Sequence, residues 1–346
     1  MSINDFLEEW HSASPTVLVH TSGSTGSPKP MYVEKRRMEA SARVTCRFLG
    51  LQPGDTSLLC MPLDYIAGKM MVVRALTGGL QLTAVEPSGH PFSALEQPVD
   101  FVAMVPLQVY NSLQVPRERA LLEQTRHLII GGGAIDDALA RELRGFPHAV
   151  WSTYGMTETL SHVALRRLSG PDASEWYTPF PSVALSLSAD GCLVIDAPQV
   201  CASRLTTNDM AELRPDGRFR ILGRKDNVVC SGGIKIQIEE VERLLRPHLA
   251  VPFLVTKCRD ERLGEALVLL TERERTGSGG LSGHEKTGAE GLTERLRTVC
   301  TSCLPRYWQP RHYIHVDSLP LTATGKPARR EAELLAVAAL SGENSQ

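Results

Sequence analysis

Residues 21–29 read TSGSTGSPK and come just after the apolar run 16–19, from which His20 separates them. A glycine-rich turn at the end of a strand can direct several backbone N–H groups at one phosphate, and hydroxyls add further donors. Lys29 supplies positive charge. The spacing is not that of a P-loop, because Gly23 and Gly26 are three residues apart and Pro30 follows the lysine. The stretch predicts a phosphate-binding loop of another kind, and the alternative is a flexible linker.

The stretch STYGMTET, residues 152–159, also follows an apolar run. The Thr157 hydroxyl beside the Glu158 carboxylate can serve a phosphate oxygen and its Mg²⁺ together, because Mg²⁺ takes one or two carboxylates plus phosphate oxygens. The ring of Tyr154 can stack on a base. The alternative is an ordinary strand-to-helix turn with Glu158 in the first helical turn.

Two further places carry charges that suit a nucleotide. Asp209 and Arg224 offer a carboxylate and a guanidinium for the hydroxyls of a ribose. Lys326, between Gly325 and Pro327, can bring positive charge to a transferring phosphate, as electrostatic catalysis requires. The alternatives are surface turns and an exposed lysine.

Near the end of the chain, Cys300 and Cys303 precede His312 and His315, a set that superficially suggests a zinc site. The gap of eight residues between the pairs and the spacing of the histidines are both shorter than in zinc fingers. Packing is therefore the preferred interpretation.

Strand and helix signals alternate through the first part of the chain, which favours a parallel, doubly wound sheet. The expected strands are 16–19, 56–62, 80–85, 100–106, 127–130 and 148–152, and the expected helices are 35–51, 67–79 and 136–145.

The pattern changes after about residue 180. Segments 183–196 and 211–224 each predict a hairpin, since an Asp-Gly pair lies in the middle of each. A compact α+β segment follows, with a helix at 238–248, a helix near 292–303 and a strand at 312–316. The glycine-rich stretch 271–291 predicts a loose surface loop. We place the domain boundary at 223–227.

Size and charge narrow the class of protein. A chain of 346 residues exceeds the usual size of one hydrophobic core, so two or more domains are expected. With 37 basic and 39 acidic residues the net charge is −2, which indicates neither nucleic acid nor an anionic membrane as a partner. No signal peptide or membrane span is expected. The prediction is a cytoplasmic protein whose eight cysteines stay reduced.

Taken together and in this order, the motifs resemble those of the adenylate-forming superfamily of acyl-CoA synthetases, adenylation domains and luciferases. The matching segments are 21–29, YGMTE at 154–158, Asp209, GRKD at 223–226, SGGIKI at 231–236 and TGKPARR at 324–330. The resemblance covers nearly the whole chain. It implies an α/β fold, with a large N-terminal domain (1–223) that has a mostly parallel sheet, helices and a β-rich part at about 181–223. A small, mobile α+β C-terminal lid domain (224–346) would follow a hinge at 224–227.

The resemblance also implies ligands and roles. ATP, Mg²⁺ and coenzyme A are the expected cofactors. The phosphates would be held by Thr21, Ser22, Gly23, Ser24, Thr25, Gly26 and Lys29. The adenine would lie against 131–134, which includes Gly132, Gly133 and Ala134, and against Tyr154, and Gly155 would be a further cofactor-binding residue. Thr157 would contact the α-phosphate, Glu158 would bind Mg²⁺, and Asp209 with Arg224 would hold the ribose. Lys326 would promote adenylation, Asp226 would be the hinge, and Ser231, Gly232 and Gly233 would face the thiol.

Within the superfamily the chain most resembles short o-succinylbenzoate–CoA ligases of menaquinone biosynthesis. Lys69 and Arg74 are candidate partners for a second carboxylate on the substrate, and the alternative is a pair of helix-surface cations. Tyr65 and His162 stand where that family often has other residues. The usual far N-terminal region is expected to be absent, so that this chain alone or another subunit, such as a second copy, completes the acyl pocket. Three other readings stay open: another aryl- or acyl-CoA ligase, an enzyme that loads a carrier protein, and a nonenzymatic nucleotide-binding regulator.

Overall fold

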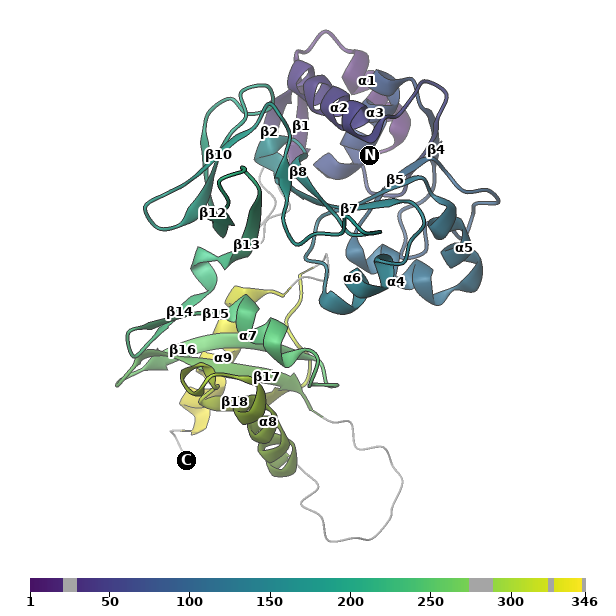
Figure 1. The fold of residues 1–346 in the computed structure, drawn as a ribbon. Helices are drawn as coiled ribbons and strands as arrows, with labels where there is room; N and C mark the ends of the chain where they lie inside the picture. Colours follow the sequence, from purple (N-terminus) through teal and green to yellow (C-terminus); the bar gives the residue numbers. More distant parts are fainter. Residues whose placement is uncertain (21–29, 274–288, 323–326, 344–346) are drawn as a thin grey trace. The chain divides into compact units, whose positions relative to one another are not determined.

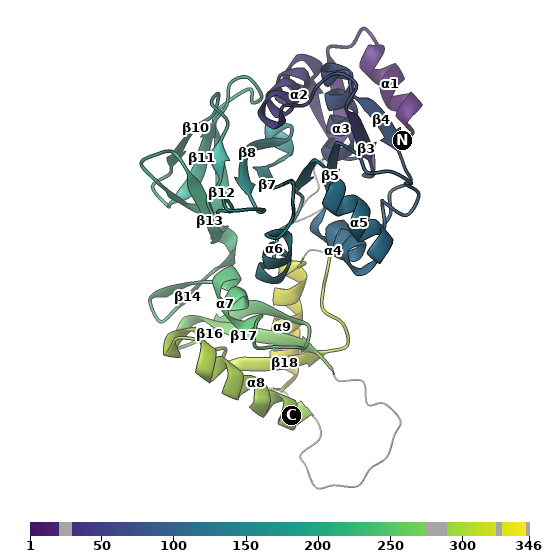
Figure 2. The ribbon, with the colours of Figure 1, turned by 45° about the vertical axis from the view of Figure 1, so that its right-hand side comes forward.

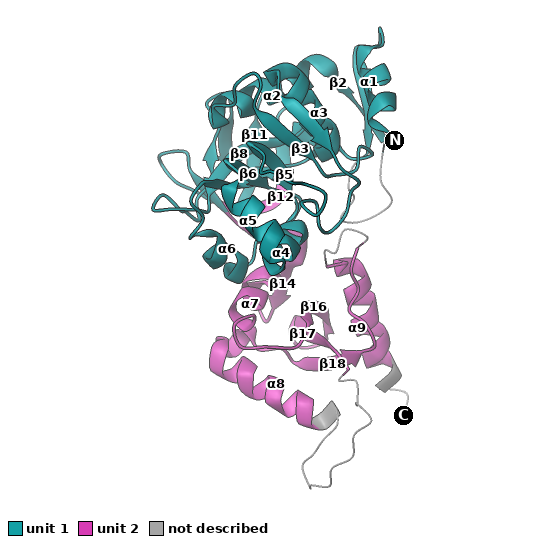
Figure 3. Ribbon diagram, turned by 90° about the vertical axis from the view of Figure 1, so that its right-hand side faces the viewer, with its two compact units in different colours: residues 1–207, 212–220 teal, residues 208–211, 221–346 magenta. Residues whose placement is uncertain are grey.

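The computed structural model describes residues 1–20, 30–273, 289–322 and 327–343 (Figure 1). The predicted phosphate loop and Lys326 lie outside the described residues. Two compact units are distinguished (Figure 3): unit 1 comprises Met1–Thr207 with Glu212–Arg220, and unit 2 comprises Asn208–Ala211 with Ile221–Gln346. The boundary at 223–227 stays a prediction.

Unit 1 is built on a seven-stranded sheet of order β4-β3-β5-β6-β7-β8-β9. The five strands from β4 to β7 run parallel, and β8 and β9 continue the sheet antiparallel to their neighbours. Their bounds are β3 (Thr56–Leu59), β4 (Gln81–Ala84), β5 (Phe101–Met104), β6 (His127–Ile130), β7 (Ala149–Gly155), β8 (His162–Arg167) and β9 (Thr178–Pro179). The predicted α/β class with a mostly parallel sheet is confirmed.

Helix α2 of unit 1 buries an apolar stripe in the hydrophobic core, where it lies against α3 and β2. In α2, Met38, Ala42, Cys46 and Leu49 recur at helical spacing and are buried. The helix ends at Gly50, whose φ of 67° gives a left-handed cap. Figures 1 and 2 show α2 beside α3 and α4 beside α5. Bounds are α2 (Lys35–Leu49), α3 (Ile66–Gly78), α4 (Pro106–Gln114), α5 (Pro116–Gln124) and α6 (Asp137–Leu143).

The first strand differs from the sequence prediction. β1 (Thr16–His20) pairs antiparallel with β2 (Pro30–Glu34) in a separate two-stranded sheet, and does not join the parallel sheet. The reason is that the chain returns directly alongside β1. The preceding helix α1 (Ile3–His11), for which the sequence analysis assigned no element, begins with a capping box between Ser2 and Asp5.

The β-rich part is a four-stranded sheet of order β10-β11-β12-β13. Its strands are β10 (Ala184–Leu187), β11 (Cys192–Asp196), β12 (Leu205–Leu213) and β13 (Phe219–Arg224). Both predicted turns are present, and Gly191 and Gly217 adopt φ values of 79° and 82°. Such values favour glycine, which explains why the Asp-Gly pairs located the hairpins.

Unit 2 has a sheet of order β15-β14-β17-β16, with β18 parallel to β17. Alternate residues of β17 point to opposite faces of the sheet, and each face packs against its own hydrophobic cluster. Leu267 and Leu269 pack in the cluster with α7 and α8, whereas Val268 and Leu270 pack with α9, which lies on the other face (Figure 3). Bounds are β14 (Val228–Ser231), β15 (Ile234–Gln237), α7 (Ile238–Leu245), β16 (Phe253–Asp260), β17 (Gly264–Glu272), α8 (Ala289–Cys303), β18 (His312–Val316) and α9 (Arg329–Glu343).

None of the helices in the described residues is long and apolar enough to cross a membrane. All eight cysteines are free thiols.

Candidate functional site

The carboxyl ends of β5, β6 and β7 meet at one edge of the parallel sheet, where ligands bind in folds of this type. The glycines that follow β6 come close to the end of β7. A Cβ atom at Gly131 would lie 2.5 Å from the Thr153 hydroxyl, and Gly132 has a φ of 77°. The predicted adenine segment 131–134 and Tyr154 are therefore brought to neighbouring strand ends.

Tyr154 belongs to an aromatic cluster that the sequence analysis missed. Its ring is 9% exposed and meets Phe219 edge-on at 5.1 Å between centroids. Phe219 stacks on Tyr177, whose hydroxyl lies 2.8 Å from the Ser152 hydroxyl oxygen. The cluster anchors Tyr154 and leaves little of its ring exposed for stacking.

Thr157 and Glu158 lie in a single 3₁₀ turn, Thr157–Thr159, directly after β7. The Thr159 hydroxyl accepts from the Met156 N–H at 2.9 Å and ties the turn together. Leu160 closes the turn with a φ of 64°, a conformation that is costly for a branched residue and accumulates at functional sites. Thr157 is buried and Glu158 is exposed, so the carboxylate is accessible to a ligand.

The chemistry of this donor set fits Mg²⁺. Within the described residues no cluster of three or more His, Cys, Asp or Glu side chains is placed to hold a metal by itself. Mg²⁺ bound to a nucleotide needs only one or two protein carboxylates, because phosphates and waters fill the other positions. Glu158, exposed beside a threonine hydroxyl, meets that requirement.

Gly155 makes the closest backbone approach in the site. A Cβ atom there would lie 2.1 Å from the Ser161 carbonyl oxygen, where β7 and β8 pair across an irregularity. We expect Gly155→Ala to lower the free energy of unfolding by about 3 kcal/mol, because backbone atoms must move. Urea unfolding measures this. Gly145→Ala is the control, because a Cβ atom at Gly145 would lie 3.9 Å from the nearest atom, the Glu142 carbonyl oxygen. Equal losses of unfolding free energy in both variants would contradict the prediction.

Arg74 lies in a buried polar cluster beneath the same strand end. It is 2% exposed and its Nη2 donates to the Ser161 hydroxyl. Burial lowers the pKa of Arg74 to about 10, so the guanidinium stays charged at neutral pH. Among the described residues, its Nε has no hydrogen-bond partner and no Asp or Glu lies within ion-pair distance. The helix-surface alternative is therefore wrong for Arg74.

His162 completes this cluster. Its Nε2 lies 3.0 Å from the Thr45 hydroxyl and its Nδ1 lies 3.2 Å from the Ser161 hydroxyl. Burial, and next the charge of Arg74, hold the pKa of His162 well below its usual value. Arg74 is then the cation of this cluster at neutral pH.

The depressed pKa of His162 makes folding sensitive to acid. Below about pH 6.5 the unfolded chain binds a proton at this histidine and the folded chain does not, so stability falls as the pH falls. Between pH 7.5 and 5.5 we expect His162→Gln to lose about 1.4 kcal/mol less unfolding free energy than the unmodified protein. Urea unfolding at both values measures this. The exposed His148→Gln variant should keep the full loss, and an unchanged loss in His162→Gln would contradict the assignment.

Lys69, the other candidate, is also buried, so the surface alternative is wrong here too. Unlike Arg74, Lys69 forms an ion pair with a carboxylate of the protein. Its Nζ lies 3.4 Å from Glu9 Oε2 and donates to the Leu18 carbonyl at 2.7 Å.

In unit 2 the predicted ribose pair is brought together. Arg224 Nη1 lies 3.2 Å from Asp209 Oδ1, although Arg224 comes fifteen positions after Asp209 in the sequence. Arg224 Nη2 also lies 3.3 Å from Asp226, the predicted hinge residue. Behind them, Gln237 donates to the Arg224 carbonyl at 2.9 Å and packs on Gly223.

Gly232 and Gly233 form the tight turn of the hairpin between β14 and β15. Their φ values are 57° and 85°, which is the positive pair that a two-residue type I′ turn requires. The segment SGGIKI is thus the tip of a hairpin and the start of β15.

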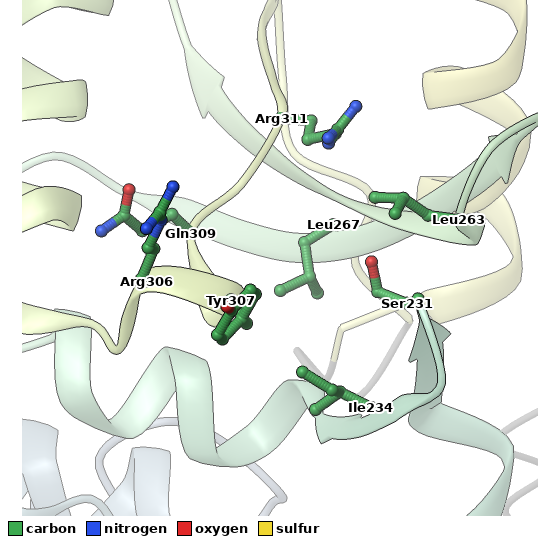
Figure 4. A pocket seen from close by; sticks show the side chains of 9 residues that line it. Ser231, Ile234, Leu263, Leu267, Arg306, Tyr307, Gln309 and Arg311 are labelled. Carbon is green, nitrogen blue, oxygen red and sulfur yellow. The ribbon is translucent and has the colours of Figure 1, made fainter.

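Beside this tip lies a cavity of about 240 Å³ (Figure 4). Tyr307, Leu267 and Ile234 face one another across it, with Ser231 at one side and Arg306 and Gln309 at the other. Arg311 also lines it and lies 3.5 Å from Asp260. The cavity combines an exposed phenol ring with two guanidinium groups.

The cysteine and histidine pairs weighed for zinc have other partners. Cys300 is fully buried in the core of unit 2. The His315 ring lies 2.7 Å from the Thr271 hydroxyl and 2.9 Å from that of Thr293. Packing thus accounts for Cys300, and hydrogen bonds account for His315.

A family model described as AMP-binding enzyme matches residues 4–200 of this chain. The chain belongs to the AMP-binding enzyme family. The resemblance predicted from the motifs is therefore confirmed, and the strand end built from 131–134 and 154–158 lies within the matched part.

Individual proteins and solved structures that resemble this chain are ligases and CoA synthetases. An acyl-CoA synthetase (AMP-forming)/AMP-acid ligase II-like protein from Dyadobacter fermentans is 34% identical, and the match covers 94% of this chain and 91% of that chain, with a TM-score of 0.62. The 2-succinylbenzoate–CoA ligase of a Geobacillus species is 25% identical over 96% of this chain and 71% of its own length. The o-succinylbenzoate CoA synthetase of Bacillus subtilis, solved with its acyl-adenylate intermediate, shares the fold at 23% identity and a TM-score of 0.73, over 91% and 68%.

Proposed function

We propose that this protein is an AMP-forming ligase that activates o-succinylbenzoate with ATP and transfers it to coenzyme A. The proposal would place the enzyme in menaquinone biosynthesis in the cytoplasm. The observation that carries the choice of acid is Arg74, a buried guanidinium without a protein carboxylate among the described residues, beside the strand end of an AMP-binding enzyme. An acid with two carboxylates has one to activate and one to pair with such a cation.

The second carboxylate would bind Arg74 through charge-assisted hydrogen bonds, which are strongest for the guanidinium–carboxylate pair. Ser161 and His162 would hold the guanidinium in place. The similarity to 2-succinylbenzoate–CoA ligases supports this acid over other dicarboxylates.

ATP would occupy the carboxyl end of the parallel sheet. Segment 131–134 and Tyr154 would border the adenine, Asp209 with Arg224 would hold the ribose, and Thr157 would contact the α-phosphate. Residues 21–29 would hold the β- and γ-phosphates. Glu158 would bind Mg²⁺, which neutralises phosphate charge when present.

The reaction has two steps. A carboxylate oxygen attacks the α-phosphorus, the bond to the β-phosphate oxygen breaks, and pyrophosphate leaves with its new negative charge opposite Lys326. The thiol of coenzyme A then loses its proton and attacks the acyl carbon, and AMP leaves with the carboxyl oxygen. Turning of the predicted C-terminal lid domain (224–346) about Asp226 would exchange Lys326 for the Ser231–Gly233 hairpin tip between the steps.

The cavity in unit 2 favours free coenzyme A over a carrier protein. Arg306 and Arg311 are suited to phosphates, and the exposed ring of Tyr307 is suited to a purine. Coenzyme A carries both groups, whereas a carrier protein presents its thiol on a single phosphate without a base.

The test is mass spectrometry of reactions that contain the protein, ATP, Mg²⁺ and o-succinylbenzoate, with and without coenzyme A. The expected products are AMP and a CoA thioester that requires every component. Acyl-adenylate without thioester would keep the acid and indicate another thiol acceptor. Absence of adenylate would contradict the proposed acid, and absence of ATP cleavage with any acid would favour a nonenzymatic role.

A further inference from the structure

We propose that Glu9 and Lys69 together close the free edge of strand β1, and that this holds in position the strand from which residues 21–29 continue. The effect on ATP binding that we derive from it rests on the proposed function. Neither side chain would touch a reactant, so both are positioning residues.

The edge of β1 is completed by side chains where a neighbouring strand would normally lie. One side of β1 pairs with β2. On the other side, the Leu18 N–H donates to Glu9 Oε1 at 2.9 Å, and Lys69 Nζ donates to the Leu18 carbonyl at 2.7 Å. An adjacent strand would provide the same acceptor and donor. Here α1 provides the acceptor and α3 the donor.

The two side chains depend on each other. Lys69 is 1% exposed, and its ammonium lies 5.2 Å from the centroid of the fully buried Phe6 ring. A buried ammonium needs a paired charge and hydrogen-bond acceptors. Glu9 supplies the charge at 3.4 Å, and the Leu18 carbonyl supplies an acceptor. Lys69 is therefore paired within the protein, whereas Arg74 meets no carboxylate among the described residues.

A second contact holds the same edge two residues further on. His20, the last residue of β1, forms a parallel bridge with Tyr65, which precedes α3. The Tyr65 carbonyl accepts from the Lys69 N–H at 3.3 Å. The start of α3 therefore holds β1 at both Leu18 and His20, and Glu9 joins α1 to this arrangement.

The consequence concerns the affinity for ATP. A phosphate-binding turn works only when its backbone N–H groups are presented in a fixed place, and small displacements of a positioning element weaken binding strongly. Loss of the Glu9 carboxylate removes the hydrogen-bond acceptor of the Leu18 N–H and the paired charge of the Lys69 ammonium.

The test compares Glu9→Ala with Glu8→Ala, which alters an exposed neighbour on the same helix. Hydrogen exchange of the Leu18 amide should become about tenfold faster in Glu9→Ala, as expected for one lost hydrogen bond to a charged acceptor. The Kd for ATP with Mg²⁺, measured by calorimetry, should rise about tenfold. Glu8→Ala should change neither value.

A double variant, Glu9→Ala with Lys69→Met, separates positioning from simple destabilisation. It removes the unpaired buried ammonium but leaves the edge of β1 open, so folding stability should recover while the Kd for ATP stays raised. Return of the Kd to its original value would overturn the proposal, and so would unchanged exchange at Leu18 in Glu9→Ala. If the unmodified protein binds no ATP, the proposed function fails, and the exchange rates still decide whether Glu9 closes the edge.

Discussion

Arg74→Met should lower kcat/KM for o-succinylbenzoate by about a thousandfold, because truncating one partner of a buried charge pair costs about 4 kcal/mol. The measurement is steady-state kinetics with o-succinylbenzoate and with 4-oxo-4-phenylbutanoate, which lacks the ring carboxylate. The unmodified enzyme should prefer the first acid by a similar factor. The Arg74→Met variant should not show this preference, because the group proposed to bind the second carboxylate has been removed.

Folding should not confound this result. In the ligand-free protein Arg74 is a buried cation without a carboxylate among the described residues, so an apolar side chain of similar length is expected to keep or raise stability. Arg144→Met changes an exposed arginine and should leave both acids unaffected. If Arg74→Met still prefers o-succinylbenzoate, another group binds the second carboxylate and the assignment of Arg74 is wrong.

Lys326→Ala should slow adenylation by about 10²–10³-fold and leave the second step within a few-fold of normal. The lysine is proposed to act only while pyrophosphate leaves, and the thiol step develops its charge elsewhere. Exchange of pyrophosphate into ATP measures the first step. Thioester formation from synthetic acyl-adenylate and coenzyme A measures the second.

The chain on both sides of Lys326 is anchored without it. Arg329 makes two hydrogen bonds to the Glu242 carboxylate, at 2.6 and 2.7 Å, and the Ala328 N–H donates to the Pro320 carbonyl at 3.0 Å. The variant is therefore expected to fold. Arg330→Ala, an exposed neighbour, is the matched control. Equal losses in both steps would show that Lys326 has no special role in adenylation.

The local elements were predictable because short-range physics determines them. The α2 pattern and its cap at Gly50, and the hairpins at Gly191 and Gly217, need only side-chain period and backbone freedom, and both appear in the sequence. The nucleotide-binding motifs and their order along the chain were also visible in the sequence. The pairing of β1 was not, because a strand's partner depends on which segment returns beside it.

The contacts in the site likewise divide into those that the sequence suggested and those that only the structure shows. The sequence suggested that Asp209 and Arg224 act together, and the structure brings them within 3.2 Å. The packing of Tyr154 against Tyr177 and Phe219 was missed, since these rings come from strands far apart in the chain. Spacing along one strand carries no information on such neighbours.

Lys69 and Arg74 show most clearly where each level of information ends. The sequence by itself determined the adenylate-forming family, the alternating elements and two cations five residues apart on one helix. Only the tertiary structure decided that both are buried, that Glu9 of α1 neutralises Lys69, and that Arg74 meets the hydroxyl of Ser161 and no carboxylate among the described residues. The physical reason is that the cost of burying a charge depends on its partners in space, and distant segments of the chain supply those partners.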